Sequence, residues 1–298
     1  MFVVRLRNVW FALSAILIAL SVFGMIKYGF NESIDFKGGT LTEVSYASST
    51  PALDAVNSQI AQLNIGGFSA RPSGDHSYII RTKELEESAK AALYQALVID
   101  GSQPVVERQN TVGPLAGAEL KSKAIKAIIV VVIMIVLFIT FAFRAVSRPV
   151  SSWKYGFATV IALFHDVIIP TGVFVFLGHF SGVEIDLLFV TGLLAILGYS
   201  VHDTIVVFDR VRENLRLAKS DEPFETTVGK SVTQTFGRSI NTSLTIFITL
   251  LALYLFGSAA TKDFALLLIV GVIVGTYSSI FVASPLLVTF FKLQKKGK

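Results

Sequence analysis

Six long apolar runs dominate this sequence and constrain its fold more than any other feature. A helix rises about 1.5 Å per residue, so about 20 mostly apolar residues cross the hydrocarbon core of a bilayer. The chain is 53% hydrophobic and 16% charged over 298 residues, which is too apolar for an ordinary soluble domain. We therefore predict a membrane α-helical bundle of six spans. These are Val9–Phe30, Ala124–Phe143, Tyr155–Leu177, Leu187–Phe208, Ile240–Phe256 and Phe264–Phe290.

Basic residues predict the orientation of the spans. The connections after the second and fourth spans and the C-terminal tail are rich in Lys and Arg, whereas the connections after the third and fifth spans are not. Because cytoplasmic loops are enriched in Lys and Arg, we expect both chain termini in the cytoplasm. The net charge of +5 then belongs to the cytoplasmic rims, and no nucleic-acid partner is expected. The basic residues are Arg144, Arg148, Lys154, Arg210, Arg212, Arg216, Lys219, Lys230, Arg238, Lys292, Lys295, Lys296 and Lys298.

Residues 31–123, between the first two spans, have the mixed composition of a soluble domain. Period-two alternation and helical spacing alternate along the segment in the order βαββαβ, which predicts a ferredoxin-like α+β domain on the extracytoplasmic side. The chain then divides into residues 1–30 with the first span, the extracytoplasmic domain 31–123, and the membrane domain 124–298 with its cytoplasmic tail. The expected strands are Thr40–Tyr46, Phe68–Arg71, Tyr78–Thr82 and Pro104–Thr111, and the helices Pro51–Leu63 and Lys83–Leu97.

Composition also limits the chemistry available. The chain has no cysteine and four histidines, with no HExxH motif, so disulfides, thiol nucleophiles and a metal site are not expected. No Walker loop is present, and no nucleophile and base can be placed together, so we expect no enzyme and no cofactor. An intramembrane aspartyl protease would need two carboxylates, but the Gly-x-Gly-Asp context is missing.

Ionisable residues inside the spans are the candidate functional residues. His165 and Asp166 lie near the middle of the third span, and His202 and Asp203 lie in the fourth. Such groups are costly in a bilayer, so they usually face a bundle interior and often mark an ion pathway. Asp166 and Asp203 are therefore candidates for a proton relay, and a buried hydrogen-bonded pair that only holds helices together is the alternative.

Arg238 enters the fifth span in TFGRSINTSLT. A cation there could be the counter-ion of Asp203, because an opposite charge favours the ionised carboxylate. It could equally be one more anchor at the cytoplasmic face. The residues alone leave both readings open.

Four ordered motifs carry a family resemblance across essentially the whole chain. IDFKGGT, residues 34–40, follows the first span, and GPLAGAEL, residues 113–120, precedes the second. LGYSVHDTIVVFDRVREN, residues 197–214, ends the fourth, and GRSINTSLT, residues 237–245, begins the fifth. With this ordered set the chain resembles the SecD/SecF family of protein-export membrane proteins, and its modest outer segment is similar to the smaller, SecF-type members.

The resemblance implies a half-transporter of the resistance-nodulation-division class in the bacterial inner membrane. Such a subunit pairs with SecD beside the SecYEG channel and uses proton flow to assist an exported unfolded polypeptide. Protons are then the coupling ion, with Asp203 and Arg238 at the matching positions. His202, where the family often has an amide, is a departure whose role stays open. Further matching residues are Gly198, Asp209 and Arg210 in the helix-end signature, and Asp35, Phe36, Gly38, Gly39 and Thr40 in the outer motif.

Two other functions compete with this expectation. A non-energetic scaffold would use the buried charges only to hold SecD at the translocon. A small-molecule proton antiporter of the same class usually needs two comparable halves with large outer domains, and this chain has one half.

Overall fold

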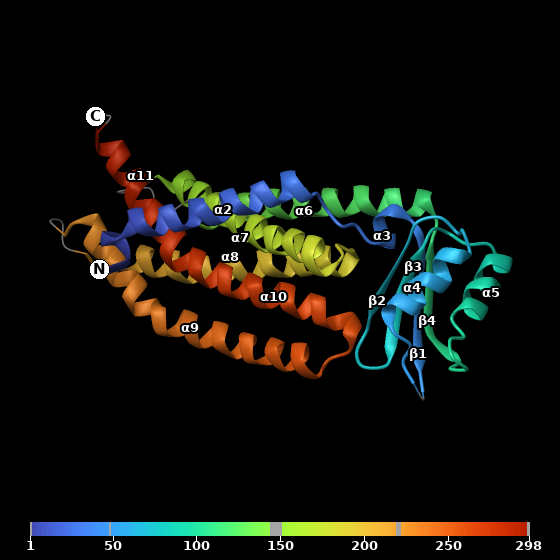
Figure 1. Ribbon diagram of the computed structural model, residues 1–298. Coiled ribbons are helices and arrows are strands. Elements are labelled where there is room, and N and C mark those ends of the chain that lie inside the picture. Colours follow the sequence, from blue (N-terminus) through green and yellow to red (C-terminus); the bar gives the residue numbers. More distant parts are fainter. Residues whose placement is uncertain (1, 48, 144–150, 219–221, 297–298) are drawn as a thin grey trace. The chain divides into compact units, whose positions relative to one another are not determined.

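The computed structural model describes residues 2–47, 49–143, 151–218 and 222–296. The chain forms two compact units (Figure 1). The helical unit comprises Met1–Phe30, Ala127–Val183 and Leu188–Lys298, and the sheet unit comprises Asn31–Lys126 and Glu184–Leu187. The predicted basic residues Arg144, Arg148, Lys219 and Lys298 lie outside the described residues.

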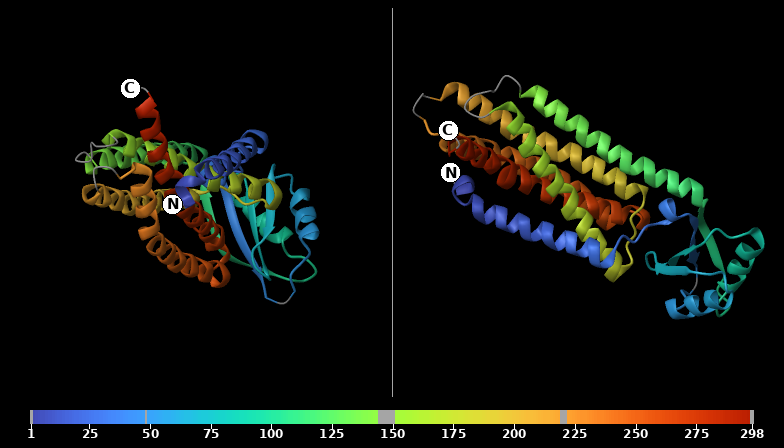
Figure 2. Two further views of the ribbon diagram at one scale, coloured as in Figure 1. Left: turned by 90° about the vertical axis from the view of Figure 1, so that its left-hand side faces the viewer. Right: turned by 90° about the horizontal axis from the view of Figure 1, so that it is seen from above.

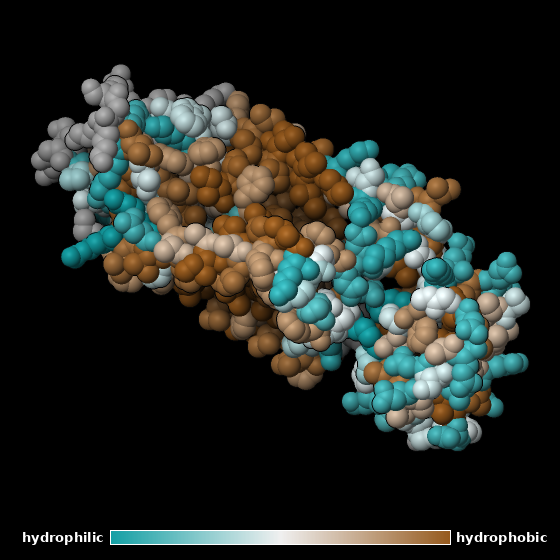
Figure 3. Space-filling model, turned by 45° about the horizontal axis from the view of Figure 1, so that its top comes forward, coloured by the Kyte–Doolittle hydropathy of each residue, from teal (hydrophilic) through white to brown (hydrophobic). Residues whose placement is uncertain are grey.

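Among the described residues, six helical segments are long and apolar enough to cross a membrane, as the sequence predicts. Apolar side chains also cover much of the outside of the helical unit, which Figure 3 shows as a broad brown surface. A surface of this kind is buried in lipid rather than in water. The chain is therefore a multi-pass membrane protein. The helices are α2 (Arg7–Tyr28), α6 (Pro114–Ala142), α7 (Ser152–Ser181), α8 (Leu187–Leu217), α9 (Phe224–Phe256) and α10 (Ala259–Ser278).

The helices extend beyond the apolar runs from which they were predicted. Helix α9 begins sixteen residues before the predicted Ile240, because Phe224, Val228 and Val232 pack into the core although polar residues separate them. The predicted sixth span, 264–290, is not one regular helix. A π-helical turn, η1 (Ser279–Ala283), interrupts it before α11 (Ser284–Lys296). A short helix α1 (Phe2–Arg5) precedes α2.

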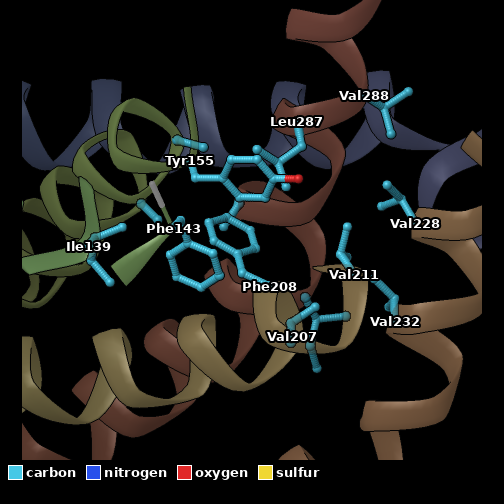
Figure 4. Packing of buried hydrophobic residues seen from close by; sticks show 14 of the residues in the cluster. Ile139, Phe143, Tyr155, Val207, Phe208, Val211, Val228, Val232, Leu287 and Val288 are labelled. Atoms are coloured by element: carbon cyan, nitrogen blue, oxygen red, sulfur yellow. The ribbon is translucent and has the colours of Figure 1, made fainter. Parts of the chain in front are cut away.

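The helical core is packed around aromatic rings (Figure 4). The rings of Phe143 and Tyr155 stack with centroids 5.4 Å apart, and both meet the edge of Phe208. Aromatic pairs of this geometry add to the free energy of burial. This cluster joins α7 and α8 to the end of α6. Around it lie Val207, Val211, Val228, Val232, Leu287 and Val288.

Glycines allow close contact between helices. A Cβ on Gly192 of α8 would lie 2.6 Å from the Leu267 side chain of α10, and a Cβ on Gly271 would overlap Ile196. Small residues at such positions let helix backbones approach each other in a membrane. The GVIVG segment, 271–275, therefore packs α10 against α8.

The sheet unit has the predicted element order. Strand β1 (Gly39–Tyr46), α4 (Leu53–Gln62), β2 (Phe68–Pro72), β3 (Ser77–Thr82), α5 (Glu87–Ala96) and β4 (Pro104–Val112) follow one another. The four strands are antiparallel to their neighbours in the order β2-β3-β1-β4. Helices α4 and α5 lie beside the sheet (Figure 2). Alternating residues of the central strands, such as Val44 and Ile80, pack against Val56 and Ile60 of α4 and Leu93 of α5. This gives the unit its own core.

The sheet unit differs in two respects from the predicted segment 31–123. It extends to Lys126, and it also includes Glu184–Leu187, the connection between α7 and α8. The reason for the second difference is a parallel β-bridge between Glu32 and Ile185. A four-residue helix, α3 (Ile34–Lys37), follows Glu32 and leads into β1.

Candidate proton-relay site

Asp203 of α8 lies inside the helical unit and is only 6% exposed. Two hydroxyl groups bind its carboxylate. Ser239 of α9 donates to Oδ1 at 2.7 Å, and Ser279 of η1 donates to Oδ2 at 2.5 Å. The carboxylate thus connects three segments of the bundle through neutral donors.

Asp166 of α7 is fully buried and has a similar set of partners. Ser278 donates a hydrogen bond of 2.7 Å to Oδ2, and Ser200 of α8 donates to the same oxygen. The neighbouring His165 places Nδ1 2.9 Å from Oδ1. Asp166 therefore connects α7 with α8 and with the end of α10.

One irregular turn brings the two carboxylate sites together. Ser278 and Ser279 are consecutive, and one binds Asp166 while the other binds Asp203. In a π turn the backbone makes bonds over five residues, and Ser284 donates its hydroxyl to the Ser279 carbonyl at 3.0 Å. Single π turns inside α-helices are often found at functional sites. Here the turn places two adjacent serines toward two different helices.

Both serines have a second acceptor within reach. Ser279 lies 3.0 Å from the Thr276 carbonyl oxygen, and Ser278 lies 3.1 Å from that of Gly275. A hydroxyl has one hydrogen and can also accept a bond. If a carboxylate takes up a proton, its serine can donate to the backbone carbonyl and accept from the new O–H group. The site can therefore hold either protonation state with its hydrogen bonds intact.

The polar network continues from Asp203 along α9 and α10. Ser243 donates to the Ser239 carbonyl at 2.7 Å and lies 2.6 Å from the Thr276 hydroxyl. The Tyr199 hydroxyl lies 2.5 Å from the hydroxyl of Ser243. Chains of hydroxyl groups of this kind can rearrange their hydrogen bonds together.

Of the two readings of Arg238 that the sequence left open, the structure does not show the pairing with Asp203. Arg238 is exposed on α9 and forms no ion pair within the described part of the chain. Its neighbour Ser239 reaches Asp203 instead. Successive residues of a helix are turned by about 100°, so only one of the two can face Asp203.

The two histidines differ in their surroundings. His202 is exposed although it precedes the buried Asp203, so it is not part of the internal network. His165 is 1% exposed and its ring stacks on Tyr277, with centroids 5.7 Å apart. Its Nε2 atom is buried and has no hydrogen-bond partner among the described residues. His165 is thus the histidine that the fold brings to the acidic residues.

The helix-end signature forms local ion pairs. Asp209 pairs with Arg212 at 2.7 Å, and Arg210 pairs with Glu213 at 2.5 Å. Arg210 also donates to Gln234 of α9 at 2.7 Å, which ties the ends of α8 and α9 together. A Cβ on Gly198 would meet nothing within 4 Å, so this glycine is not required for packing within the chain.

The IDFKGGT motif needs its glycines for close backbone contact. Gly38 and Gly39 have φ values of 77° and 135°, which favour glycine. A Cβ on Gly38 would lie 2.8 Å from the Pro114 Cα, and one on Gly117 would lie 2.9 Å from the Gly38 nitrogen. The motif and the GPLAGAEL segment are therefore packed on each other.

The other residues of this motif support the sheet unit. Phe36 is buried, Thr40 bonds to the Thr111 hydroxyl of β4 at 3.0 Å, and the Asp35 carboxylate accepts the Leu187 amide at 3.0 Å. All of the predicted motif residues thus make contacts in the sheet unit.

The serines that bind the two carboxylates were not among the residues predicted from the sequence. Ser200, Ser239, Ser278 and Ser279 are all buried and all bind a carboxylate. Serine is common in membrane helices at helix contacts, so its presence alone is a weak signal. Two sequence features could have indicated three of them. These are the segment SINTS, residues 239–243, which follows Arg238, and the pair of consecutive serines at 278 and 279.

Comparison with known proteins agrees with this architecture. The family model described as "Protein export membrane protein SecD/SecF, C-terminal" matches residues 94–293, and the "SecD/SecF GG Motif" matches residues 23–50. The chain belongs to the SecD/SecF family. The protein translocase subunit SecF of Thermobaculum terrenum is 40% identical over 97% of this chain and 93% of its own length. The subunit SecF of Anaerolinea thermophila is 37% identical over 95% and 91%.

SecDF proteins are similar over a part of their length. The crystal structure of SecDF from Thermus thermophilus, a translocon-associated membrane protein, matches with a TM-score of 0.83 at 32% identity, covering 99% of this chain and 38% of that one. SecDF of Brucella abortus is 34% identical over 96% of this chain and 36% of its own length. The chain is a protein translocase subunit of the SecF/SecDF type, and the SecDF relatives support a SecD-type partner.

Proposed function

We propose that this chain is the SecF-like subunit of a SecD-SecF accessory complex that uses the proton motive force to assist protein translocation through the Sec channel. The observation that carries the proposal is the pair of buried carboxylates bound by two adjacent serines, Ser278 at the end of α10 and Ser279 at the start of the π turn η1. Intramembrane carboxylates in a bundle interior are typical of proton pathways. No covalent chemistry is proposed, so the chain acts as a transport subunit rather than an enzyme.

Proton uptake is proposed to change how the helices are bound to one another. Asp203 holds α8, α9 and η1 through two hydroxyl donors. When the carboxylate is protonated, one serine accepts from the new O–H group and donates to a backbone carbonyl instead, so a hydrogen bond to a charged group becomes a weaker bond between neutral groups. A proton moving down 100 mV releases about 2.3 kcal/mol, which is comparable to the net free energy of about 1.5–3 kcal/mol for one hydrogen bond to a charged group. Such a change drives movement only if the two conformations bind the proton unequally.

Arg238 is proposed to act through the partner subunit. It is exposed on α9 in a stripe with other exposed polar residues at helical spacing, which would be costly against lipid. A SecD-type membrane helix with an acidic or hydroxyl side chain would satisfy this face. The stripe comprises Arg238, Asn241, Thr242, Thr245 and Thr249.

The topology completes the proposal. The sheet unit is proposed to be a ferredoxin-like extracytoplasmic domain, with both termini in the cytoplasm of a bacterial cell and the helices in its inner membrane. The support is the βαββαβ order and the distribution of Lys and Arg between the connections. SecYEG and the exported polypeptide are partners implied by this function.

Asp203→Asn and Arg238→Met test the proposal. Both variants should abolish the stimulation of export by the proton gradient in vesicles that contain the SecD-type partner, because they remove the titrating group and the charge. The matched control Arg216→Met changes an exposed arginine near the end of α8 and should keep full stimulation. Full stimulation in both test variants would overturn the proposal.

Co-purification with the partner separates the main alternative. If the chain is a non-energetic scaffold, the two variants should lose the SecD-type subunit. We expect Asp203→Asn to retain it, because Asp203 is only 6% exposed and cannot form much of an interface. We expect Arg238→Met to retain it as well, because Asn241 and the threonines of the same stripe remain. A small-molecule antiporter would instead show proton-driven drug or ion transport in the same vesicles without an exported polypeptide.

A further inference from the structure

The connection between α7 and α8, Glu184–Leu187, is built into the sheet unit and is called the tether here. Its backbone forms a parallel bridge with the chain just before α3. Ser33 donates its amide to the Ile185 carbonyl at 3.0 Å, and Ile185 donates its amide to the Asn31 carbonyl at 2.8 Å. Ile185 itself is buried. The tether is therefore paired like a short strand rather than lying free as a loop.

Asp35 of the IDFKGGT motif binds the end of the tether. Its Oδ2 atom accepts the backbone amide of Leu187 at 3.0 Å, and Leu187 is the first residue of α8. The first amides of a helix have no acceptor within the helix, and a negative charge at that end is favourable. The cap of α8 thus comes from a residue more than 150 positions earlier in the chain.

Glu184, the first residue of the tether, contacts strand β3. Its Oε2 atom lies 2.6 Å from Nε of Arg81 in β3, and the two side chains are only 11% and 15% exposed. Burial raises the pKa of Glu184 to about 7, while the charges of Arg81, Arg71 and Lys37 oppose this rise and Asp186 adds to it. The contact between Glu184 and Arg81 and the Asp35 cap thus lie at the two ends of the tether.

We propose that Asp35 and Glu184 are positioning residues that couple the sheet unit to α8, the helix that carries Asp203. The role of this coupling in transport rests on the proposed function. Helix α8 runs without interruption from Leu187 to Leu217, so the capped residue and Asp203 belong to the same helix. A helix that shifts when the bonds of Asp203 change must pull on the tether. Coupling of this kind is reciprocal, so a change at the tether must also be felt at Asp203.

The absence of cysteine in the chain allows a direct test. In the variant Ile185→Cys, the single thiol is buried while the tether is paired and is alkylated only when it opens. The measurement is the alkylation rate of the full chain in lipid nanodiscs, which expose both faces. Adding Asp35→Ala should raise the rate several-fold. The matched control Asp54→Ala, in the exposed first turn of α4, should leave the rate unchanged.

Asp203→Asn distinguishes coupling from a merely structural role. In the Ile185→Cys background, Asp203→Asn should change the alkylation rate, and this effect should disappear when Asp35→Ala is also present. An unchanged rate in Asp203→Asn, or equal rates in Asp35→Ala and Asp54→Ala, would overturn the proposal. If the thiol variant does not fold, hydrogen exchange of the Ile185 and Leu187 amides in the cysteine-free chain gives the same comparison.

The pH dependence of opening tests the part of Glu184. The pKa of Glu184 is about 7 in the paired state, whereas the ordinary pKa of a glutamate is 4.5, so pairing binds a proton between these pH values. The paired state is thus most stable below pH 4.5 and loses stability as the pH rises through 7. From pH 6 to 8 opening should increase by up to about tenfold. Glu184→Gln should remove this increase. The alkylation rate also rises with pH because the thiolate is the reactive form of Cys. The rates with Glu184 and with Glu184→Gln are therefore compared at each pH, so that this effect cancels. The same increase in Glu184→Gln would contradict the role of Glu184.

The measurements on the tether do not depend on protein export. Alkylation and hydrogen exchange measure the tether in the absence of a channel or a proton gradient. If Asp203→Asn keeps full export stimulation, the proposed function fails even where the tether responds. If stimulation is lost but the tether does not respond to Asp203→Asn, the coupling fails and the proposed function stands.

Discussion

Individual hydroxyl groups set the chemistry of the buried acids. Ser239 and Ser279 both donate to Asp203, and no cation lies beside that carboxylate within the described residues. A bound cation would favour the ionised form, whereas a hydroxyl can donate to a carboxylate or accept from a carboxylic acid. The two serines can therefore bind Asp203 either as a carboxylate or as a carboxylic acid.

Ser279→Ala should remove one of the two donors to Asp203. A hydrogen bond to a charged group contributes about 1.5–3 kcal/mol, so the balance between the protonated and ionised states should change by up to about a hundredfold. We expect most of the gradient-dependent export stimulation to be lost while the partner still co-purifies. The control is Ser258→Ala, an exposed serine before α10 whose hydroxyl has only a 3.4 Å contact with Thr261. Equal stimulation in the two variants would show that the Ser279 bond is not needed.

At the scale of elements, irregular or closely packed segments carry the functional geometry. Where the π turn Ser279–Ala283 begins, the consecutive residues Ser278 and Ser279 bind side chains of two different helices, α7 and α8. Pro170 stays inside the continuous helix α7, where it removes the amide that would bond to the carbonyl of Asp166. Pro170 of α7 and the π turn that follows α10 thus both lie near Asp166.

The contact between the two glycine motifs gives a prediction for the sheet unit. Gly117→Ala would place a Cβ 2.9 Å from the Gly38 nitrogen and 3.1 Å from the Phe36 carbonyl carbon, and backbone cannot move aside easily. Overpacking of this kind costs about 1–3 kcal/mol. The variant should unfold or be digested by protease at a lower temperature than the native chain. In Gly113→Ala the new Cβ meets nothing within 4 Å, so this control should behave like the native chain.

At the scale of the whole molecule, the chain presents surfaces that it does not satisfy by itself. The exposed stripe of α9 combines an arginine with an asparagine and threonines, whereas the exposed face of α6 is apolar and includes Met134 and Leu137. Lipid can cover the apolar face, but a polar face in the same environment needs a protein partner. The match to only 38% of the SecDF chain agrees with a partner of considerable size.

A photo-crosslinking experiment can identify the face that meets the partner. A benzophenone maleimide attached to Thr245→Cys should capture the SecD-type subunit, because Thr245 lies in the polar stripe. The same reagent on Met134→Cys, which is 60% exposed on α6, should capture lipid but not that subunit. Capture from position 134 and not from 245 would contradict the assignment of the interface.

Sequence alone determined the elements of this protein. Hydropathy runs depend on the local chain, so the six spans and the βαββαβ order could be predicted, and two acids inside apolar runs indicated Asp166 and Asp203. The ordered motifs identified the family, which the comparisons confirm.

Only the tertiary structure decided which groups meet. The partner of Asp203 depends on the rotation of α9 about its axis, where one residue turns Ser239 inward and leaves Arg238 exposed. The π turn and the pairing of Ile185 with the chain before α3 depend on contacts between residues far apart in sequence. No local pattern records such contacts, because each is set by how whole elements pack.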